Sequence, residues 1–214
     1  MSKGGNKRET SVQESWRAVH GPKNRSRARE NPCRKHETRP TDPESSLYQK
    51  IHMHTNPAGV IKDTALQKVV MQSASDGAIR ELKRGEDGEN SAFELISNFY
   101  RAFREAFHDE WDDQTPRTSR LVHSAGIVAL GYVMELLYAR DKAKETSEFL
   151  AGLTCLLGKT AWTRGAWHFS EIDITPWNEV QNTGRDIRKL TDHLVRLVRN
   201  DRSIRLRHQQ RQKA

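Results

Sequence analysis

The longest regular pattern of hydrophobic and polar positions lies between residues 91 and 111. Large apolar side chains recur there at steps of three or four residues, at Phe93, Ile96, Tyr100, Phe103, Phe107 and Trp111. This spacing places them along one face of a helix and turns Arg104 and Asp109 away from it. Ser91 and Glu94 have the spacing of a capping box, so we expect the helix to begin there. Its apolar face predicts a partner surface.

A second helix is predicted to begin at Thr118 or Ser119 and to end near residue 140. It is apolar on more than one side, which is typical of the central helix of a bundle. Gly126 and Gly131 would let another helix approach it closely, since glycine is otherwise unfavourable in a helix. Residues 121–139 approach the length of a membrane span, but they include polar and charged side chains, so a buried helix is favoured.

Two further helices follow towards the C-terminus. The first is expected to be capped by Thr146 and closed by Gly158. The last opens at Thr183 with Asp186 and is predicted to fray into a basic tail after about residue 198. Its apolar positions are Ile187, Leu190, Leu194 and Leu197.

The N-terminal side of the ordered region predicts a small β-hairpin. Residues 46–54 alternate loosely as a strand, residues 56–59 form a turn, and residues 60–61 supply a short partner strand. A helix capped by Asp63 or Thr64 is expected next, ending near Gly77.

These patterns together predict a mainly α protein: a bundle of four or five helices, with a small N-terminal β-hairpin and disordered basic tails. We expect residues 1–45 to form a disordered basic arm, residues 46–200 the helical domain and residues 201–214 a basic C-terminal tail. The arm holds few large apolar side chains, so it cannot bury enough apolar surface to offset its chain entropy.

Charge is distributed unevenly along the chain. The formal net charge is +8, and the excess of Lys and Arg lies in the two ends, whereas the middle is mildly acidic. A basic protein of this kind has nucleic acid, here DNA, as its first candidate partner. The arginines expected to contact phosphates are Arg25, Arg27, Arg29, Arg196, Arg199, Arg202, Arg205 and Arg207.

Residues 162–183 combine tryptophans with amide side chains and show no regular pattern, so we expect an irregular segment. Rings of this size need a core to bury them, which is the favoured interpretation. The alternative is an exposed platform on which bases stack. The residues of this candidate aromatic and amide site are Trp162, Arg164, Trp167, Trp177, Asn178, Gln181 and Asn182.

No metal site and no cofactor are predicted. Residues 108–113 carry four carboxylates and a histidine, but successive helical residues point in different directions, so a solvated acidic turn is favoured over a divalent metal site. His52 and His54 share a strand face without an evident third ligand. Cys33 and Cys155 are too few and too far apart for a disulfide framework, which fits a reducing, cytoplasmic location.

Five stretches of the chain form a series that resembles a known family. They are residues 46–51, 59–61, 93–103, the helix around 126–127, and 177–183 followed by Asp186, Ile187 and Leu190. The series, over residues 46–198, resembles the C-terminal part of DGQHR-domain proteins. That family includes regulators and accessory proteins of DNA sulfur modification and is distantly related to the ParB-like nuclease fold.

The chain also departs from this family. The Asp-Gly-Gln-His-Arg string does not occur, and the N-terminal ParB-like half that would carry it has no room here. The resemblance therefore implies the helical half alone, and no family active-site residue carries over.

We therefore expect a non-enzymatic accessory or regulatory protein of a DNA modification, defence or mobile-element system. It would contact nucleic acid through its basic tails and bind a protein partner or a second copy through its helices, with no membrane association. Two alternatives stay open: a metal-dependent nucleic-acid-processing enzyme that uses residues 108–113, and a truncated DGQHR-domain remnant without activity.

Overall fold

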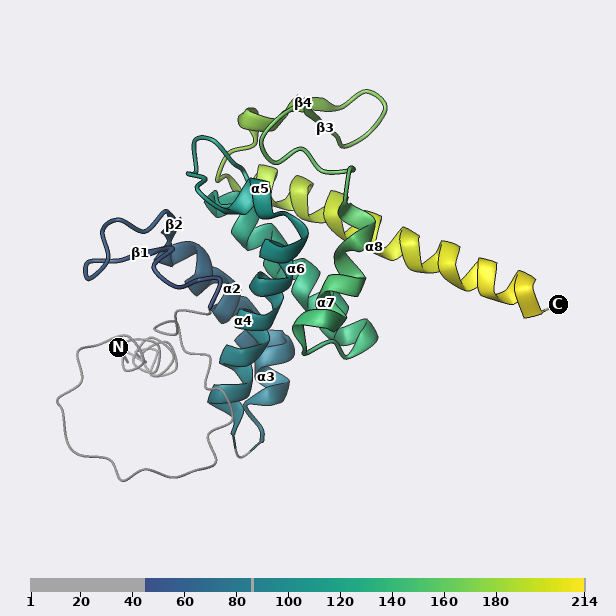
Figure 1. Ribbon diagram of the computed structural model, residues 1–214, viewed down its shortest axis with the longest axis horizontal. Coiled ribbons are helices and arrows are strands. Elements are labelled where there is room, and N and C mark those ends of the chain that lie inside the picture. The colour runs from purple at the N-terminus through teal and green to yellow at the C-terminus, as the bar shows by residue number, and fades with distance from the viewer. Residues whose placement is uncertain (1–44, 86, 214) are drawn as a thin grey trace, which may run out of the picture. The chain divides into compact units, whose positions relative to one another are not determined.

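The computed structural model describes residues 45–85 and 87–213, with side chains up to residue 201. Within these residues the fold is mainly helical, as the sequence predicts (Figure 1). The helices are α2 (Asp63–Asp76), α3 (Ala78–Leu82), α4 (Gly88–Ala106), α5 (His108–Trp111), α6 (Ser124–Asp141), α7 (Thr146–Leu153) and α8 (Gly184–Lys213). The strands are β1 (Ile51–His52), β2 (Ile61–Lys62), β3 (Ala166–His168) and β4 (Ile174–Pro176). The predicted N-terminal arm lies outside the described residues.

Helix α6 is the central element, as its all-round apolar pattern predicts. It packs against α8 and α2 and also contacts α3 and α7, and most of its side chains are buried. A Cβ at Gly131 would lie 2.8 Å from Val69 Cγ2 of α2, so the predicted close approach of a second helix is confirmed there. Gly126 instead faces the backbone carbonyl of Arg120, so its role in helix packing was wrongly predicted.

Helix α4 buries the aromatic face that the sequence predicts. Of that face, Tyr100 and Phe103 are fully buried in the core, whereas Phe93 is only partly buried; Phe99, outside the predicted face, is fully buried too. The predicted continuation of the helix to Trp111 is interrupted at Phe107, after which α5 begins. The helix begins at Gly88, one turn before the predicted start, and Ser91 N–H already donates to the Asp87 carbonyl at 3.0 Å. The predicted capping box at Ser91 is therefore wrong, because this serine lies inside the helix.

Two other helix starts differ from the prediction. Helix α6 begins at Ser124 and is capped by His123, whose Nδ1 accepts the Ala125 N–H at 3.3 Å. The predicted start at residue 118 or 119 fails because Ser119 is buried and its hydroxyl donates to the Glu110 carbonyl at 2.7 Å. Helix α7 is capped by a box formed by Glu145 and Glu148, one position before the predicted cap.

The predicted N-terminal hairpin is replaced by a parallel pair. Ile51 of β1 pairs with Ile61 of β2 in parallel register. The chain reverses at residues 53–56, and the side chain of Asn56 holds the reversal by donating to the carbonyls of Gln49 and Ile51, both at 2.9 Å. A second turn then brings the chain back over β1, where a Cβ at Gly59 would lie 2.2 Å from Ile51. Two reversals give parallel strands, whereas a hairpin needs one.

The segment predicted to be irregular contains a short antiparallel hairpin. Trp167 of β3 lies opposite Thr175 of β4. Trp167 is buried, and so is Phe169, which directly follows the strand, whereas His168 between them is exposed. The alternation spans only a few residues, which is too short for a periodicity argument to detect.

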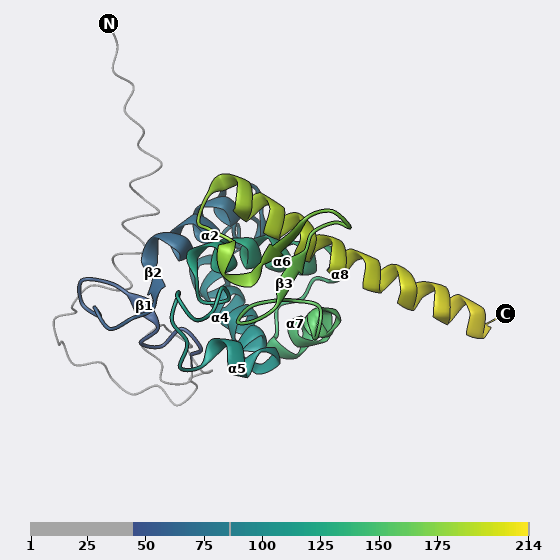
Figure 2. The same cartoon turned by 90° about the horizontal axis from the view of Figure 1, so that it is seen from above.

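Helix α8 continues through the residues expected to form the C-terminal tail. Its backbone is helical from Gly184 to Lys213, and Figures 1 and 2 both show its C-terminal part running beyond the other labelled elements. Its start agrees with the prediction, because Asp186 N–H donates to the Thr183 hydroxyl at 3.1 Å. No helix of the described residues is both long enough and apolar enough to cross a membrane.

Candidate functional site

A groove of about 1340 Å³ lies between the α2–α3 pair and α8, with α6 as its floor. We call it the α6 groove. One side is lined by Lys68 of α2 and by Arg84, which follows α3. The other side is lined by Arg188 and Arg199 of α8. On the floor, Tyr132 of α6 keeps 39% of its surface exposed, so the groove combines basic sides with an aromatic base.

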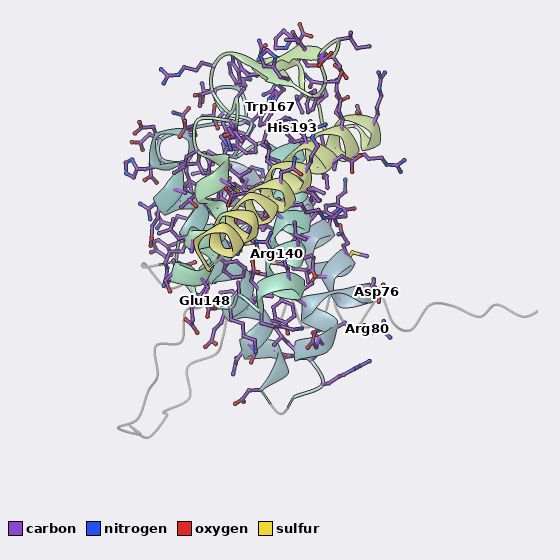
Figure 3. All side chains as sticks on the ribbon, turned by 90° about the vertical axis from the view of Figure 1, so that its right-hand side faces the viewer. Asp76, Arg80, Arg140, Glu148, Trp167 and His193 are labelled. Carbon is purple, nitrogen blue, oxygen red and sulfur yellow. The ribbon has the colours of Figure 1, made fainter. Side chains whose placement is uncertain are left out.

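Other charges of the groove neutralise one another. On α2 and α3, Arg80 Nη1 lies 3.0 Å from Asp76 Oδ1 in an exposed ion pair, and both side chains are labelled in Figure 3. Where the groove meets the end of α6, Lys142 Nζ lies 3.8 Å from Glu81 Oε1 and also 5.3 Å from the Tyr138 ring centre. Exposed pairs of this kind contribute little stability, but they remove two cations from the free charge of the groove.

Tyr138 belongs to the same paired cluster. Burial, followed by the nearby carboxylates of Glu81 and Glu135, raises the pKa of the Tyr138 hydroxyl above its ordinary value. A hydrogen bond with Glu81 acts in the same direction. The hydroxyl therefore stays protonated at neutral pH and acts as a donor.

The remaining basic side chains of the groove have no acidic partner. All are exposed and none forms an ion pair with a described residue; they are Lys68, Arg84, Arg188 and Arg199. Among the groove carboxylates, those without an ion pair are Glu135 and Asp192. The unpaired positive charges outnumber the unpaired negative ones, so the groove attracts an anion.

Glu135 lies on the floor, one turn of α6 beyond Tyr132. Its Oε2 accepts the backbone N–H of Ala78 at 2.8 Å, which satisfies the first donor of α3. Its Oε1 is buried and has no hydrogen-bond partner among the described residues. The hydroxyl of Thr191, on the α8 side, is also buried and unpaired, so the groove lies over two polar groups that the protein leaves unsatisfied.

The predicted nucleic-acid-binding arginines do not form one site. Arg199 lines the α6 groove. Arg196 instead holds the β3–β4 hairpin, because its Nη2 donates to the Phe169 carbonyl at 2.8 Å and to His193 Nδ1 at 3.0 Å. Arg202, Arg205 and Arg207 lie in the C-terminal part of helix α8, and Arg25, Arg27 and Arg29 lie outside the described residues.

The predicted tryptophan platform does not form, because two of its rings are in the core. Trp162 and Trp167 are 2% and 1% exposed, and their rings pack edge to face with centroids 4.9 Å apart. Figure 3 shows Trp167 beside His193 of α8, beneath the hairpin. The favoured sequence interpretation, that these rings belong to the core, is confirmed.

Trp177 is only half buried, and Arg120 covers its ring at 5.7 Å. The guanidinium of Arg120 is itself buried; it donates to the carbonyls of Pro116, at 2.7 Å, and Asn178. Burial lowers the pKa of Arg120 below its ordinary value. The other polar residues of the predicted site, Arg164, Gln181 and Asn182, are exposed. Of these, Gln181 Nε2 donates to the Asn178 carbonyl at 3.3 Å, the same carbonyl that Arg120 binds.

The acidic run at residues 108–113 forms the short helix α5 and the turn that follows it. Asp112 is held by Arg104 Nε, 3.0 Å from its Oδ1, and by His108 Nε2, 2.9 Å from its Oδ2. The side chain of Asp109 is 98% exposed. Within the part of the chain that the structure describes, no three His, Cys, Asp or Glu side chains lie together in a way that could hold a metal ion. His52 and His54 therefore have no third ligand among these residues.

Sequence reasoning missed Lys68, Arg84, Arg188 and Tyr132 as members of one site. Lys68 and Arg84 lie in the acidic middle of the chain, where a segment-by-segment charge balance hides them. Arg188 was counted only as part of a basic end. Tyr132 was hidden within the most apolar helix, where no local signal separates it from Tyr138, which is only 4% exposed.

No family model matches this chain, and neither a curated protein nor a solved structure is significantly similar to it.

Proposed function

We propose that this protein is a non-enzymatic, cytoplasmic accessory or regulatory protein of a DNA modification, defence or mobile-element system that binds nucleic acid. The observation that supports nucleic-acid binding is the set of unpaired basic side chains on both sides of the α6 groove. The resemblance to the helical part of DGQHR-domain proteins supports the kind of system.

The groove adds a second electrostatic surface to the basic ends of the chain. Lys68 and Arg84 come from one side and Arg188 and Arg199 from the other, so a polyanion lying along α6 contacts both sides at once. Cations held on helices lose less side-chain and chain freedom on binding than cations on an unstructured tail. The groove therefore orients the nucleic acid.

The test is a titration of a fluorescent DNA oligonucleotide at several salt concentrations. A variant with Lys68, Arg84 and Arg188 all changed to Gln should bind more weakly, and its salt slope should fall by up to about 3, about one unit for each lost phosphate contact. The control variant changes Arg117, Lys144 and Lys159 to Gln; these exposed residues do not line the groove and give the same change in charge. Equal salt slopes for the two variants would reject the groove as the interface.

A further inference from the structure

The excess of positive charge in the α6 groove does not explain why the ring of Tyr132 is exposed at its floor. Most of helix α6 is buried, whereas Tyr132 is 39% exposed at the base of the groove. Val128 and Leu136, four residues away on either side, lie on the same face and also line the groove. The floor is therefore a narrow apolar stripe with one aromatic ring at its centre.

Basic side chains on both sides of an aromatic floor are the elements of a site for single-stranded nucleic acid. Bases stack on aromatic rings regardless of sequence, and a basic groove follows the phosphates. Here the ring comes from α6, and the unpaired cations stand on the two sides, at Lys68, Arg84, Arg188 and Arg199. A strand lying along α6 can place a base on the floor and its phosphates against either side.

The spacing of the helices favours a single strand over a duplex. Helix α6 packs against both α2 and α8. Helices pack with axes about 8–10 Å apart, so the axes of α2 and α8 are no more than about 20 Å apart. Side chains fill about 5–6 Å around each axis, which leaves about 10 Å between the two sides. This is less than the roughly 12 Å width of the major groove alone of a DNA duplex.

We propose that the α6 groove binds a single-stranded nucleic acid segment, with one base stacked on Tyr132 and neighbouring phosphates held by the basic side chains of α2, the residues after α3, and α8. This inference rests on the proposed function and specifies the substrate class of the same site. A helix of a partner protein is the competing occupant, but the excess of unpaired cations on both sides matches a polyanion.

The experiment uses the full chain with a 12-nucleotide DNA strand that carries 2-aminopurine at its centre, its RNA equivalent and its DNA duplex. Tyr132→Ala should weaken binding of the single strand about 5–100-fold, the range that base–aromatic stacking gives, and should leave duplex binding unchanged. Tyr132→Phe, which keeps the ring, should bind within about twofold of wild type. Met71→Ala, which removes a 45% exposed side chain of α2 outside the groove, is the matched control and should have no effect.

The fluorescence of 2-aminopurine gives a second readout, because stacking on the ring quenches it. We expect quenching by wild type and by Tyr132→Phe but not by Tyr132→Ala. Comparison of the affinities for the DNA and RNA strands then shows whether the groove prefers deoxyribose or ribose. Unchanged single-strand affinity for Tyr132→Ala, or an equal loss for strand and duplex, would overturn the inference. If either result is found but the variant of Lys68, Arg84 and Arg188 still has a lower salt slope than wild type, the proposed nucleic-acid binding by the groove is retained and only the stacked base is rejected. If wild type binds none of the probes, both proposals fail.

Discussion

Trp162 and Trp167 pack edge to face in a row of rings that also includes Phe103 and Phe169. A dense run of tryptophans predicts burial because each ring has a large apolar area to remove from water. That argument holds for these two tryptophans and fails for Trp177, which stays half exposed under Arg120. Composition alone cannot separate them, because the difference depends on a guanidinium that comes from a distant part of the chain.

We predict that Trp167→Ala lowers the free energy of unfolding by about 3–5 kcal/mol, the usual cost of removing a buried aromatic side chain. Trp177→Ala, the matched control, should cost less than half of that, since its ring is only partly buried. Chemical denaturation of both variants provides the comparison. Equal losses for the two variants would contradict the difference in burial between the two rings.

At the scale of elements, the long helices were predictable and their ends were not. Repeating apolar positions in α4, α6 and α8 determine where each helix packs, and this information is spread over many residues. Starts depend on one or two hydrogen bonds, such as the acceptance of Ala125 N–H by His123, which no capping rule would select from the sequence. The strand pairs are shorter still, and the parallel direction of β1 and β2 depends on the side chain of Asn56.

The start of helix α6 is held in place by close packing at Gly126. A Cβ at this position would lie 2.0 Å from the Arg120 carbonyl oxygen, a backbone atom that cannot move aside easily. We predict that Gly126→Ala lowers the free energy of unfolding by about 1–3 kcal/mol or more. Gly184→Ala, at the first residue of α8, meets no atom within 4 Å and should change it by less than about 1 kcal/mol. If thermal or urea unfolding gave the two variants the same loss of stability, the close packing of the Arg120 backbone against α6 would be contradicted.

The cap of α6 makes stability depend on pH. Burial, with the nearby charges of Arg120 and Lys62, lowers the pKa of His123 from 6.5 to about 4. Below pH 6.5 the unfolded chain binds this proton while the folded chain does not, so the free energy of unfolding falls as the pH falls from about 6.5 to about 4. Burial lowers the pKa of His193 too, so it adds to the same trend.

We predict that His123→Asn weakens this pH dependence. Asparagine is a good cap and can accept the Ala125 N–H, but it does not titrate. Urea unfolding at several values between pH 7 and pH 4 should therefore give a shallower loss of stability than in wild type, with the remaining slope due to His193 and the carboxylates. A slope identical to that of wild type would show that His123 is not the titrating cap.

At the scale of the whole molecule, the α6 groove could not be predicted from the sequence. Its cations come from α2, from the residues after α3, and from α8, and each becomes part of a site only when these helices pack around α6. The sequence did predict the excess of positive charge and the central place of α6. The missing information was which cations the fold pairs with carboxylates and which it leaves unpaired.

Removal of an unpaired carboxylate from the groove should strengthen DNA binding, whereas removal of its unpaired cations should weaken it. Asp192 lines the groove on the α8 side, is exposed and forms no ion pair with a described residue. Asp192→Asn removes a negative charge from the surface that a polyanion approaches, so we expect tighter DNA binding and little change in stability. Glu179→Asn, at an exposed position outside the groove, makes the same change in charge and should have a smaller effect. Weaker binding by the Asp192 variant in a salt titration would contradict the proposed location of the strand.

The most direct measurement of the central claim, that nucleic acid lies in the α6 groove, is a map of backbone amide chemical shifts. The full chain, labelled with ¹⁵N, is titrated with the 12-nucleotide strand in moderate salt. We predict that the largest shifts cluster around Lys68, Tyr132, Arg188 and Arg199, with little change in the β3–β4 hairpin or at residues 108–113. Shifts confined to those two regions, or to the chain ends alone, would contradict it.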